Sequence, residues 1–325
     1  MPEGRVAARL LAADMNNLSN AGDGRGGGPG APERLGRWLV GGPPLAYLVV
    51  FFALPSLIMV LASFRSPGEF GGLAPLVGED GALDLNLESY ARFFTDTIYA
   101  EIFLKSFWYA LLTTLLCLAL AYPLALLIAR SGKKHRDLLL LLVILPFWSN
   151  FLIRVYAWMI ILGPQAALAR GVNAALAAFG HEPVSLLFSA FAVLVCLVYV
   201  HLPFMVLPLY ANLEKHDQAL LDAAQDLGAN AWQRFWRITF PLSLPGVYAG
   251  AALVFIPALG IFAIPDILGG PDDSLIGNVI KQQFLETRDW PFGSVLSIVL
   301  TVAAVGLAAL AAWVGRRSGG RAFGA

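Results

Sequence analysis

Residues 106–129, SFWYALLTTLLCLALAYPLALLIA, form an apolar run without a charged side chain. An α-helix rises about 1.5 Å per residue, so about 20 such residues cross the ~30 Å hydrocarbon core of a bilayer. The run is therefore long enough to span a membrane. It lacks the alternation of polar and apolar residues that marks a barrel strand, so we expect it to be a helix.

The same kind of run recurs along the chain. Four more runs carry no charge, and one further run carries a single charge, Arg154. Of the 325 residues, 58% are hydrophobic and 14% are charged, whereas about a quarter of an ordinary soluble domain is charged. We therefore predict an all-α integral membrane protein with six transmembrane helices. The predicted spans are about 38–64, 106–129, 138–163, 184–211, 244–268 and 291–315.

The two ends of the chain differ from the apolar middle. The stretch Gly22–Pro32, GDGRGGGPGAP, is too rich in Gly and Pro to bury a core. We expect residues 1–37 to form a disordered cytoplasmic arm, 38–316 the six-span domain and 317–325 a cytoplasmic tail. The first apolar run starts too late and is too long for a cleaved signal peptide.

Basic residues are unevenly distributed between alternate loops. Loops rich in Lys and Arg stay in the cytoplasm. The remaining loops hold few basic residues, and the first of them is crowded with Asp and Glu. Both termini are therefore predicted to be cytoplasmic. The basic residues on that side are Arg5, Arg9, Arg25, Arg34, Arg37, Arg130, Lys133, Lys134, Arg136, Lys215, Arg234, Arg237, Arg316, Arg317 and Arg321.

The cytoplasmic loop 212–243, NLEKHDQALLDAAQDLGANAWQRFWRITFPLS, is longer than a simple connector. A helix is predicted over Gln218–Leu227, with Asp217 as its N-cap and Gly228 as its C-terminal glycine. A second short helix is predicted over Ala231–Ile238. This hairpin either sits in a groove of another protein or lies on the lipid headgroups.

Two prolines follow the second predicted helix. Pro241 and Pro245 follow it, at the start of the fifth span. Proline removes a backbone donor and its ring clashes with the preceding turn of a helix. We therefore expect the chain to break before the fifth span.

The loop also carries a spaced set of residues. Asp222-Ala223-Ala224, Gly228, Ile238 and Pro241 resemble the E-A-A-x(3)-G-x(9)-I-x-L-P signature of bacterial ABC importer permeases. Asp222 replaces Glu and Phe240 replaces Leu, and the spacing is kept. In that family the segment is the coupling helix, held in a cleft of the ATPase subunit. The resemblance implies the coupling role for Asp222, Ala223, Ala224, Gly228, Ile238 and Pro241.

Other stretches are similar to the spermidine/putrescine branch of this family. They are LPFW at 145–148 with the residues after it, and the stretches 197–215, 257–270 and 275–294. The resemblance covers roughly 38–316 and implies the type I permease fold, a bacterial inner-membrane location and import of polyamines by alternating access. The implied partners are a second homologous permease, two ATPase subunits and a periplasmic substrate-binding protein. An opine, thiamine or ferric ion remains an alternative cargo.

No motif for chemistry within the chain itself was found. The sequence has no phosphate loop ending in Gly-Lys-Ser/Thr, no H-E-x-x-H motif and no G-x-S-x-G motif. Its four histidines are scattered, and His201 is expected to be buried and bonded to backbone. We expect no enzyme activity, cofactor, metal or nucleic-acid partner. A membrane enzyme or channel acting alone would leave loop 212–243 unexplained.

Two ionisable residues near the outer ends of spans are candidates for the transport pathway, because charge inside a membrane is costly. Arg154 either serves the pathway or extends to the outer interface. Asp266 either binds cargo or is a helix-end carboxylate in solvent. We hypothesise that Arg154 pairs with Asp266 in one transport state and releases it in another.

Aromatic side chains at similar depth offer faces to cationic cargo. They also occur in packing and in interfacial belts, so both roles remain open. In the last outer loop, Ile276, Val279, Ile280 and Phe284 recur at helical spacing and predict a short helix. A periplasmic binding protein or the lipid surface would contact that helix. The candidate pathway residues are Trp148, Asn150, Arg154, Tyr156, Trp158, Phe262 and Asp266.

Overall fold

The computed structural model describes residues 41–77 and 84–321, with side chains as far as Leu310. Within these ranges the chain is helical, apart from loops and one isolated β-bridge between Pro67 and Leu73. The prediction of an all-α fold with six membrane-spanning helices is confirmed. The helices long and apolar enough to cross a membrane are Gly41–Ala62, Thr97–Arg130, Phe151–Ala178, Ala190–Leu213, Ala231–Leu259 and Trp290–Leu310. The predicted arm, residues 1–37, lies outside the described residues.

The chain divides into two compact units, the first ending at Met59. Most of the first membrane helix belongs to this unit. That helix passes through a π-helical turn, η1 (Val49–Ala53), into α3 (Leu54–Ala62). The N–H of Leu54 donates to the carbonyl of Val49, and Pro55 follows directly. The wide π-turn leaves room for the proline ring, so the helix continues without a break.

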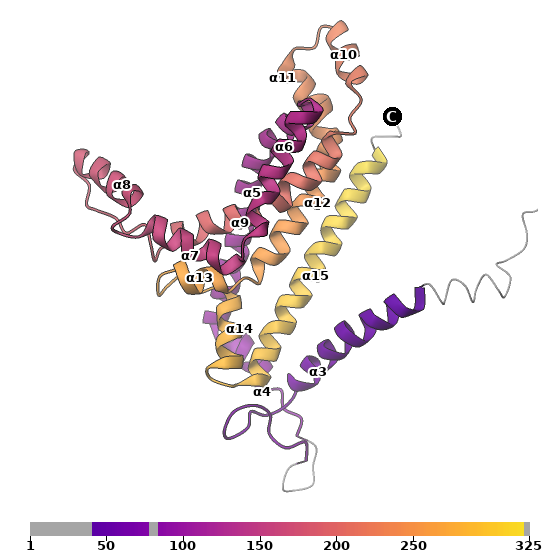
Figure 1. Cartoon of the computed structure of the whole chain (residues 1–325). Coiled ribbons are helices and arrows are strands. Elements are labelled where there is room, and N and C mark those ends of the chain that lie inside the picture. Colours follow the sequence, from indigo (N-terminus) through magenta and orange to yellow (C-terminus); the bar gives the residue numbers. More distant parts are fainter. Residues whose placement is uncertain (1–40, 78–83, 322–325) are drawn as a thin grey trace, which may run out of the picture. The chain divides into compact units, whose positions relative to one another are not determined.

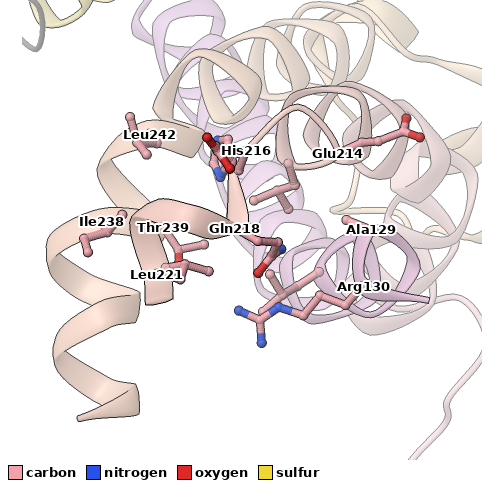
Figure 2. A pocket seen from close by; sticks show the side chains of 12 residues that line it. Ala129, Arg130, Glu214, His216, Gln218, Leu221, Ile238, Thr239 and Leu242 are labelled. Atoms are coloured by element: carbon pink, nitrogen blue, oxygen red, sulfur yellow. The ribbon is translucent and has the colours of Figure 1, made fainter. Parts of the chain in front are cut away.

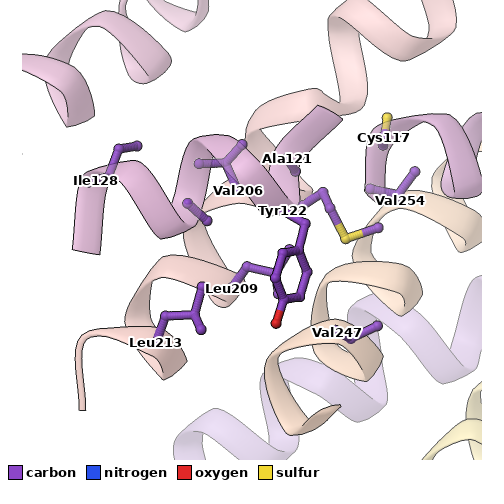
Figure 3. Close-up of a cluster of buried hydrophobic side chains, with 11 residues drawn as sticks. Cys117, Ala121, Tyr122, Ile128, Val206, Leu209, Leu213, Val247 and Val254 are labelled. Carbon is purple, nitrogen blue, oxygen red and sulfur yellow. The ribbon is translucent and has the colours of Figure 1, made fainter. Parts of the chain in front are cut away.

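Three long helices form the core of the second unit: α5 (Thr97–Arg130), α9 (Ala190–Leu213) and α12 (Phe240–Leu259). Their side chains meet in one buried cluster (Figure 3). Inside it, the hydroxyls of Tyr122 and Ser243 share a buried hydrogen bond of 2.8 Å between α5 and α12. The buried members are Cys117, Ala121, Tyr122, Ala125, Ile128, Met205, Val206, Leu209, Leu213, Val247 and Val254.

Two glycines let α12 pack closely against α9. A Cβ atom at Gly246 would lie 2.8 Å from Cβ of Asn212 and 3.1 Å from the carbonyl oxygen of Pro208. A Cβ atom at Gly250 would lie 2.7 Å from the sulfur of Met205. This Gly-x-x-x-Gly spacing lets helix backbones approach in a membrane, where apolar side chains alone do not drive association.

The close approach predicts that Gly246→Ala destabilises the second unit. Its methyl group meets a Cβ atom and a backbone oxygen, neither of which can move freely, and overpacking of this kind costs about 1–3 kcal/mol. The measurement is the Tm of the detergent-solubilised protein. Gly306→Ala in α15 (Trp290–Arg321) is the matched control, because a Cβ there meets nothing within 4 Å. Equal Tm values for the two variants would contradict the close contact.

The third predicted span, 138–163, differs from a single helix. The structure has α6 (Lys133–Ile144), a 3₁₀ turn η2 (Leu145–Trp148) and α7 (Phe151–Leu162). Pro146 lies at the start of η2, and the side chain of Asn150 accepts a hydrogen bond from the backbone N–H of Leu152 at 2.8 Å. Asn150 thus caps a new helix, which explains the interruption.

The third candidate membrane segment, Phe151–Ala178, accordingly comprises α7 and α8 (Ala167–Ala178), which a short turn at 163–166 separates. The fifth predicted span also has different ends. The expectation that Pro241 and Pro245 break the chain is wrong, because α11 (Ala231–Arg234), the π-turn η3 (Phe235–Thr239) and α12 follow one another without interruption. As at Pro55, the π-turn directly precedes the X-Pro step and accommodates the ring.

Three more helices lie at the end of the second unit opposite α10 (Gln218–Asp226) (Figure 1). They are α4 (Glu88–Thr95), α13 (Ala263–Leu268) and α14 (Ile276–Leu285), and α15 (Trp290–Arg321) starts beside them. The predicted helix in the last outer loop is therefore confirmed as α14. Its apolar face packs on protein, in a cluster of Tyr99, Ile276, Val279, Phe292 and Leu296.

Candidate functional site

The predicted coupling loop, residues 212–243, contains α10, whose two ends are both capped as predicted. Asp217 accepts a hydrogen bond from the N–H of Ala219 at 2.9 Å. Gly228 has φ +83°, and its N–H donates to the carbonyl of Gln225 at 2.8 Å. The N–H of Ala229 donates to the carbonyl of Ala224 at 2.9 Å. This pair of bonds is a Schellman motif, which needs a left-handed residue at the position of Gly228.

A short capped turn connects α10 to α11. The side chain of Asn230 accepts from the N–H of Gln233 at 2.8 Å, and the Gln233 side chain accepts from the N–H of Asn230 at 3.0 Å. This reciprocal pair is a capping box. Arg234 Nη1 donates to Oε1 of Gln225 at 2.6 Å, which ties α11 back to α10. The two helices therefore form one hydrogen-bonded unit.

The outward side of α10 is uncovered. Asp222 and Ala223 are exposed, and Ala224 is half-buried. Leu227 is 89% exposed and Leu220 is 50% exposed. Since no described side chain covers these two leucines, they and the small residues of α10 form an apolar surface, which either a protein groove or lipid would cover.

The base of the loop is an aromatic cluster formed by Trp232, Phe235, Trp236 and Phe240. Consecutive members lie close together: the ring centroids of Phe235 and Trp236 are 5.2 Å apart, and those of Trp236 and Phe240 are 5.0 Å apart. Tyr122 of α5 packs edge-on against Phe235 at 5.5 Å. The cluster therefore connects the loop to the buried core through aromatic contacts.

A small cavity of about 40 Å³ lies under the loop, where α9 leads into α10 (Figure 2). Its lining includes Ile238, Thr239, Arg130, His216 and Gln218. This volume is large enough for a water molecule. The signature residue Ile238 thus faces the base of the coupling loop, whereas Pro241 is exposed at the second position of α12.

The Schellman motif predicts a local effect of replacing Gly228. Gly228→Ala places a Cβ in the left-handed region, which costs about 1–2 kcal/mol. Amide hydrogen exchange across 217–230 should therefore quicken about tenfold, while exchange in α12 stays unchanged. Gly228→Asn is the matched variant, and its effect should be smaller because Asn tolerates this conformation. Identical exchange in all three proteins would exclude the motif as the determinant of loop order.

The second candidate site lies at the α14 end, around Asp266 in α13. One oxygen of Asp266 accepts a hydrogen bond from Lys281 Nζ at 2.7 Å, and the other accepts from the side-chain amide of Asn278. That amide also donates to the carbonyl of Phe262 at 2.9 Å, and its oxygen accepts from the N–H of Leu275 at 3.0 Å. The pKa of Lys281 is raised because its ammonium donates to Asp266.

A glycine contact places α14 against the break between α12 and α13. A Cβ at Gly277 would lie 2.6 Å from the carbonyl oxygen of Gly260 and 2.7 Å from that of Ile261. Only glycine lets the first turn of α14 approach this closely. A cavity of about 370 Å³ lies beside the contact, lined by Lys281 and Phe262 among others.

The structure brings together only some of the predicted pathway residues. Phe262 and Asp266 lie in the second candidate site. Around the break before α7, the guanidinium of Arg154 lies 5.3 Å from the ring centroid of Phe147. Among the described residues Asp266 pairs with Lys281 rather than with Arg154, so the hypothesised ion pair is not formed in this structure.

The remaining pathway candidates lie on or next to α7. Trp148 is 77% exposed and Tyr156 is 48% exposed. Trp158 packs edge-on against Tyr199 of α9 at 5.6 Å. Asn150 caps α7. Sequence reasoning missed Asn278 and Lys281, although their spacing of three residues places them on one face of a predicted helix.

No metal centre is formed by the described residues: they hold no group of three His, Cys, Asp or Glu side chains placed to bind an ion. His201 is buried, and its Nδ1 lies 2.8 Å from the carbonyl oxygen of Leu197, as predicted.

Comparison with known proteins assigns the family. Residues 121–319 match the family model of the binding-protein-dependent transport system inner membrane component. The chain belongs to this family. The match includes the whole coupling loop and the site around Asp266. The chain is therefore a multi-pass permease component of the inner membrane, and its role is transport rather than catalysis.

Individual relatives extend the match over most of the chain. The chain is 44% identical over 271 residues to the spermidine/putrescine transport system permease protein PotB of Escherichia coli strain K12, covering 83% of this chain and 94% of that protein. It is equally similar to PotB of Salmonella typhimurium strain SL1344, covering 83% and 90%.

A solved structure has the same fold. It is a bacterial alginate ABC transporter in complex with an alginate pentasaccharide-bound periplasmic protein, with a TM-score of 0.68. The match covers 86% of this chain and 95% of that chain at 19% sequence identity. At this identity the likeness shows the fold alone, which is that of an ABC transporter permease.

Proposed function

We propose that this chain is the permease subunit of an ABC importer that moves spermidine/putrescine-type polyamines from the periplasm to the cytoplasm. Its similarity to spermidine/putrescine permeases over most of its length is the observation that carries the proposal. The capped, exposed coupling loop supports an ATP-driven mechanism, because it offers a surface to a separate ATPase.

The charges support an orientation with the α10 end in the cytoplasm. In the described residues, basic side chains cluster around that end. The rule that Lys and Arg mark cytoplasmic loops supports a cytoplasmic position for this end, and an even number of spans supports the same side for both termini. The basic residues in question are Arg130, Lys133, Lys134, Arg136, Lys215, Arg234 and Arg237.

The partner proteins follow from this orientation and from the family. The exposed face of α10, with Ala223 and Leu227, docks in a groove of an ATPase subunit. A second, homologous permease faces this chain across the pathway, and each permease engages one of two ATPase subunits. A periplasmic substrate-binding protein delivers cargo to the opposite end, near α14.

Transport proceeds by alternating access. Closure of the two ATPase subunits on ATP moves α10, and the hydrogen bond between Arg234 and Gln225 makes α11 follow. Because η3 and α12 continue from α11 without a break, α12 moves as well. The coupling is reciprocal, so delivery of cargo should stimulate ATP hydrolysis.

The cargo site uses charge and aromatic faces. Polyamines carry several ammonium groups, which carboxylates and ring faces bind, each cation–π contact contributing about 0.5–2 kcal/mol. Asp266 supplies a carboxylate, and Phe262, 46% exposed, supplies a ring beside it. Tyr156 on α7 adds an exposed ring, and α7 packs against α13.

Uptake of labelled polyamine tests the function. Cells lacking this gene should lose vanadate-sensitive uptake of labelled spermidine and putrescine, and the gene on a plasmid should restore it. The partner subunits must be present in every strain. Uptake of labelled thiamine and ferric ion in the same strains serves as the matched control and should not change.

If deletion leaves polyamine uptake unchanged and alters uptake of another labelled cargo, the polyamine assignment is contradicted. The assignment as an ABC permease would still hold. Uptake that persists in vanadate and requires only this chain would instead favour a channel acting alone.

A further inference from the structure

Lys281 lies between two carboxylates at the α14 end. Its Nζ is 2.7 Å from Oδ2 of Asp266 and 3.8 Å from Oε1 of Glu286. The side chain of Asp266 is 29% exposed, that of Lys281 is 32% exposed and that of Glu286 is 59% exposed. The lysine ammonium therefore has one close partner and one alternative partner within reach.

The carboxylate of Asp266 is the fixed member of this trio. It is held by the side-chain amide of Asn278, which is itself bonded to the carbonyl of Phe262 and to the N–H of Leu275. Lysine, in contrast, carries its charge on a flexible four-carbon stem with rotatable donors. When the pair opens, the lysine moves and the carboxylate stays in place.

A primary ammonium is also the terminal group of a polyamine. Lys281 thus presents to Asp266 the same chemical group as the cargo of the proposed function. Two carboxylates and one ammonium leave the trio with one net negative formal charge, which one further ammonium would neutralise. The raised pKa of Lys281 keeps its own charge in place at neutral pH.

A second ammonium group can approach Asp266 from solvent, because the side chain of Asp266 is 29% exposed, and Lys281 borders an open cavity. The cavity of about 370 Å³ next to Lys281 is lined by Phe262 and Phe284 and by the hydroxyl residues Ser297 and Thr301. Partly exposed ion pairs contribute little to stability, so the pair between Lys281 and Asp266 can open at low cost.

We propose that Lys281 is a tethered competitor of the cargo: it occupies Asp266 when no polyamine is bound and moves to Glu286 when a cargo ammonium takes its place. This proposal rests on the proposed function. It makes Lys281 and Glu286 determinants of cargo affinity, although neither needs to touch the cargo.

The test is the KM of labelled spermidine uptake in variants of the full importer. Lys281→Gln removes the competitor and should lower KM about three- to fivefold, the factor that an exposed ion pair of ordinary strength represents. Glu286→Gln removes the alternative partner and should raise KM by a similar factor. In the Lys281→Gln background, the Glu286→Gln change should alter KM less than twofold, because no lysine remains to be accommodated.

The matched control is Lys105→Gln, another lysine at this end, which lies 3.9 Å from Asp273. It should leave KM unchanged. A purely structural role of Lys281 would lower Vmax and the yield of assembled importer with KM unchanged, and that result would overturn the proposal. If the Lys281→Gln chain does not assemble into the importer, the single variant Glu286→Gln decides: an unchanged KM in that variant overturns the proposal. A wild-type importer without any polyamine uptake would instead refute the proposed function.

Discussion

The unbroken helical path from Ala231 to Leu259 is the constraint on which the coupling account depends. A non-helical hinge at Pro241 would let α10 move without α12. A movement of the ATPase would then displace the loop and leave α12 in place. The π-turn before Pro241 prevents that hinge, and the same arrangement precedes Pro55 in the first helix. Aromatic contacts around Phe235 join this path to α5, and the close approach at Gly246 joins it to α9. In the proposed mechanism, motion of the loop would therefore reach the core of the second unit through these packed contacts.

The same path ends beside the proposed cargo site. Helix α12 ends at Leu259. The first turn of α14 packs, through Gly277, against the non-helical residues that follow α12. Asn278, one residue further, orients Asp266. A displacement of α12 would thus change the position of the carboxylate relative to Lys281, whose backbone lies on α14. In the proposed mechanism, the trio of Asp266, Lys281 and Glu286 therefore lies near one end of α12, and the coupling loop would move the other end.

The parts of the fold and of the candidate sites that depend on neighbouring residues could be predicted from the sequence. The six spans follow from apolar runs, and the ends of α10 follow from Asp217 and Gly228, because caps depend on residues only a few positions apart. Pro241 and Pro245 misled the prediction, because proline is tolerated inside helices of membrane proteins. A π-turn precedes Pro241, whereas Pro123, Pro203 and Pro208 lie inside continuous α-helices. The partner of Asp266 could not be predicted, because Lys281 reaches it only after α13 and α14 pack together. The interruption before α7 has a local signal, Pro146 followed by Asn150. The prediction of a single span over 138–163 followed the hydropathy of the segment and did not use that signal.

Cross-linking from the coupling loop tests the central claim most directly. The chain has two cysteines, Cys117 and Cys196, both buried with 0% exposure, so a cysteine introduced at Ala223 would be the accessible thiol. A thiol-reactive photo-cross-linker on Ala223→Cys should attach this chain to the ATPase subunit in membranes, whereas the same reagent on Ala174→Cys in the exposed α8 should not. Because the ATPase uses cytoplasmic ATP, that result would also place α10 in the cytoplasm. An ATPase subunit that co-purifies with the Ala223→Cys permease yet never cross-links to it would contradict the account.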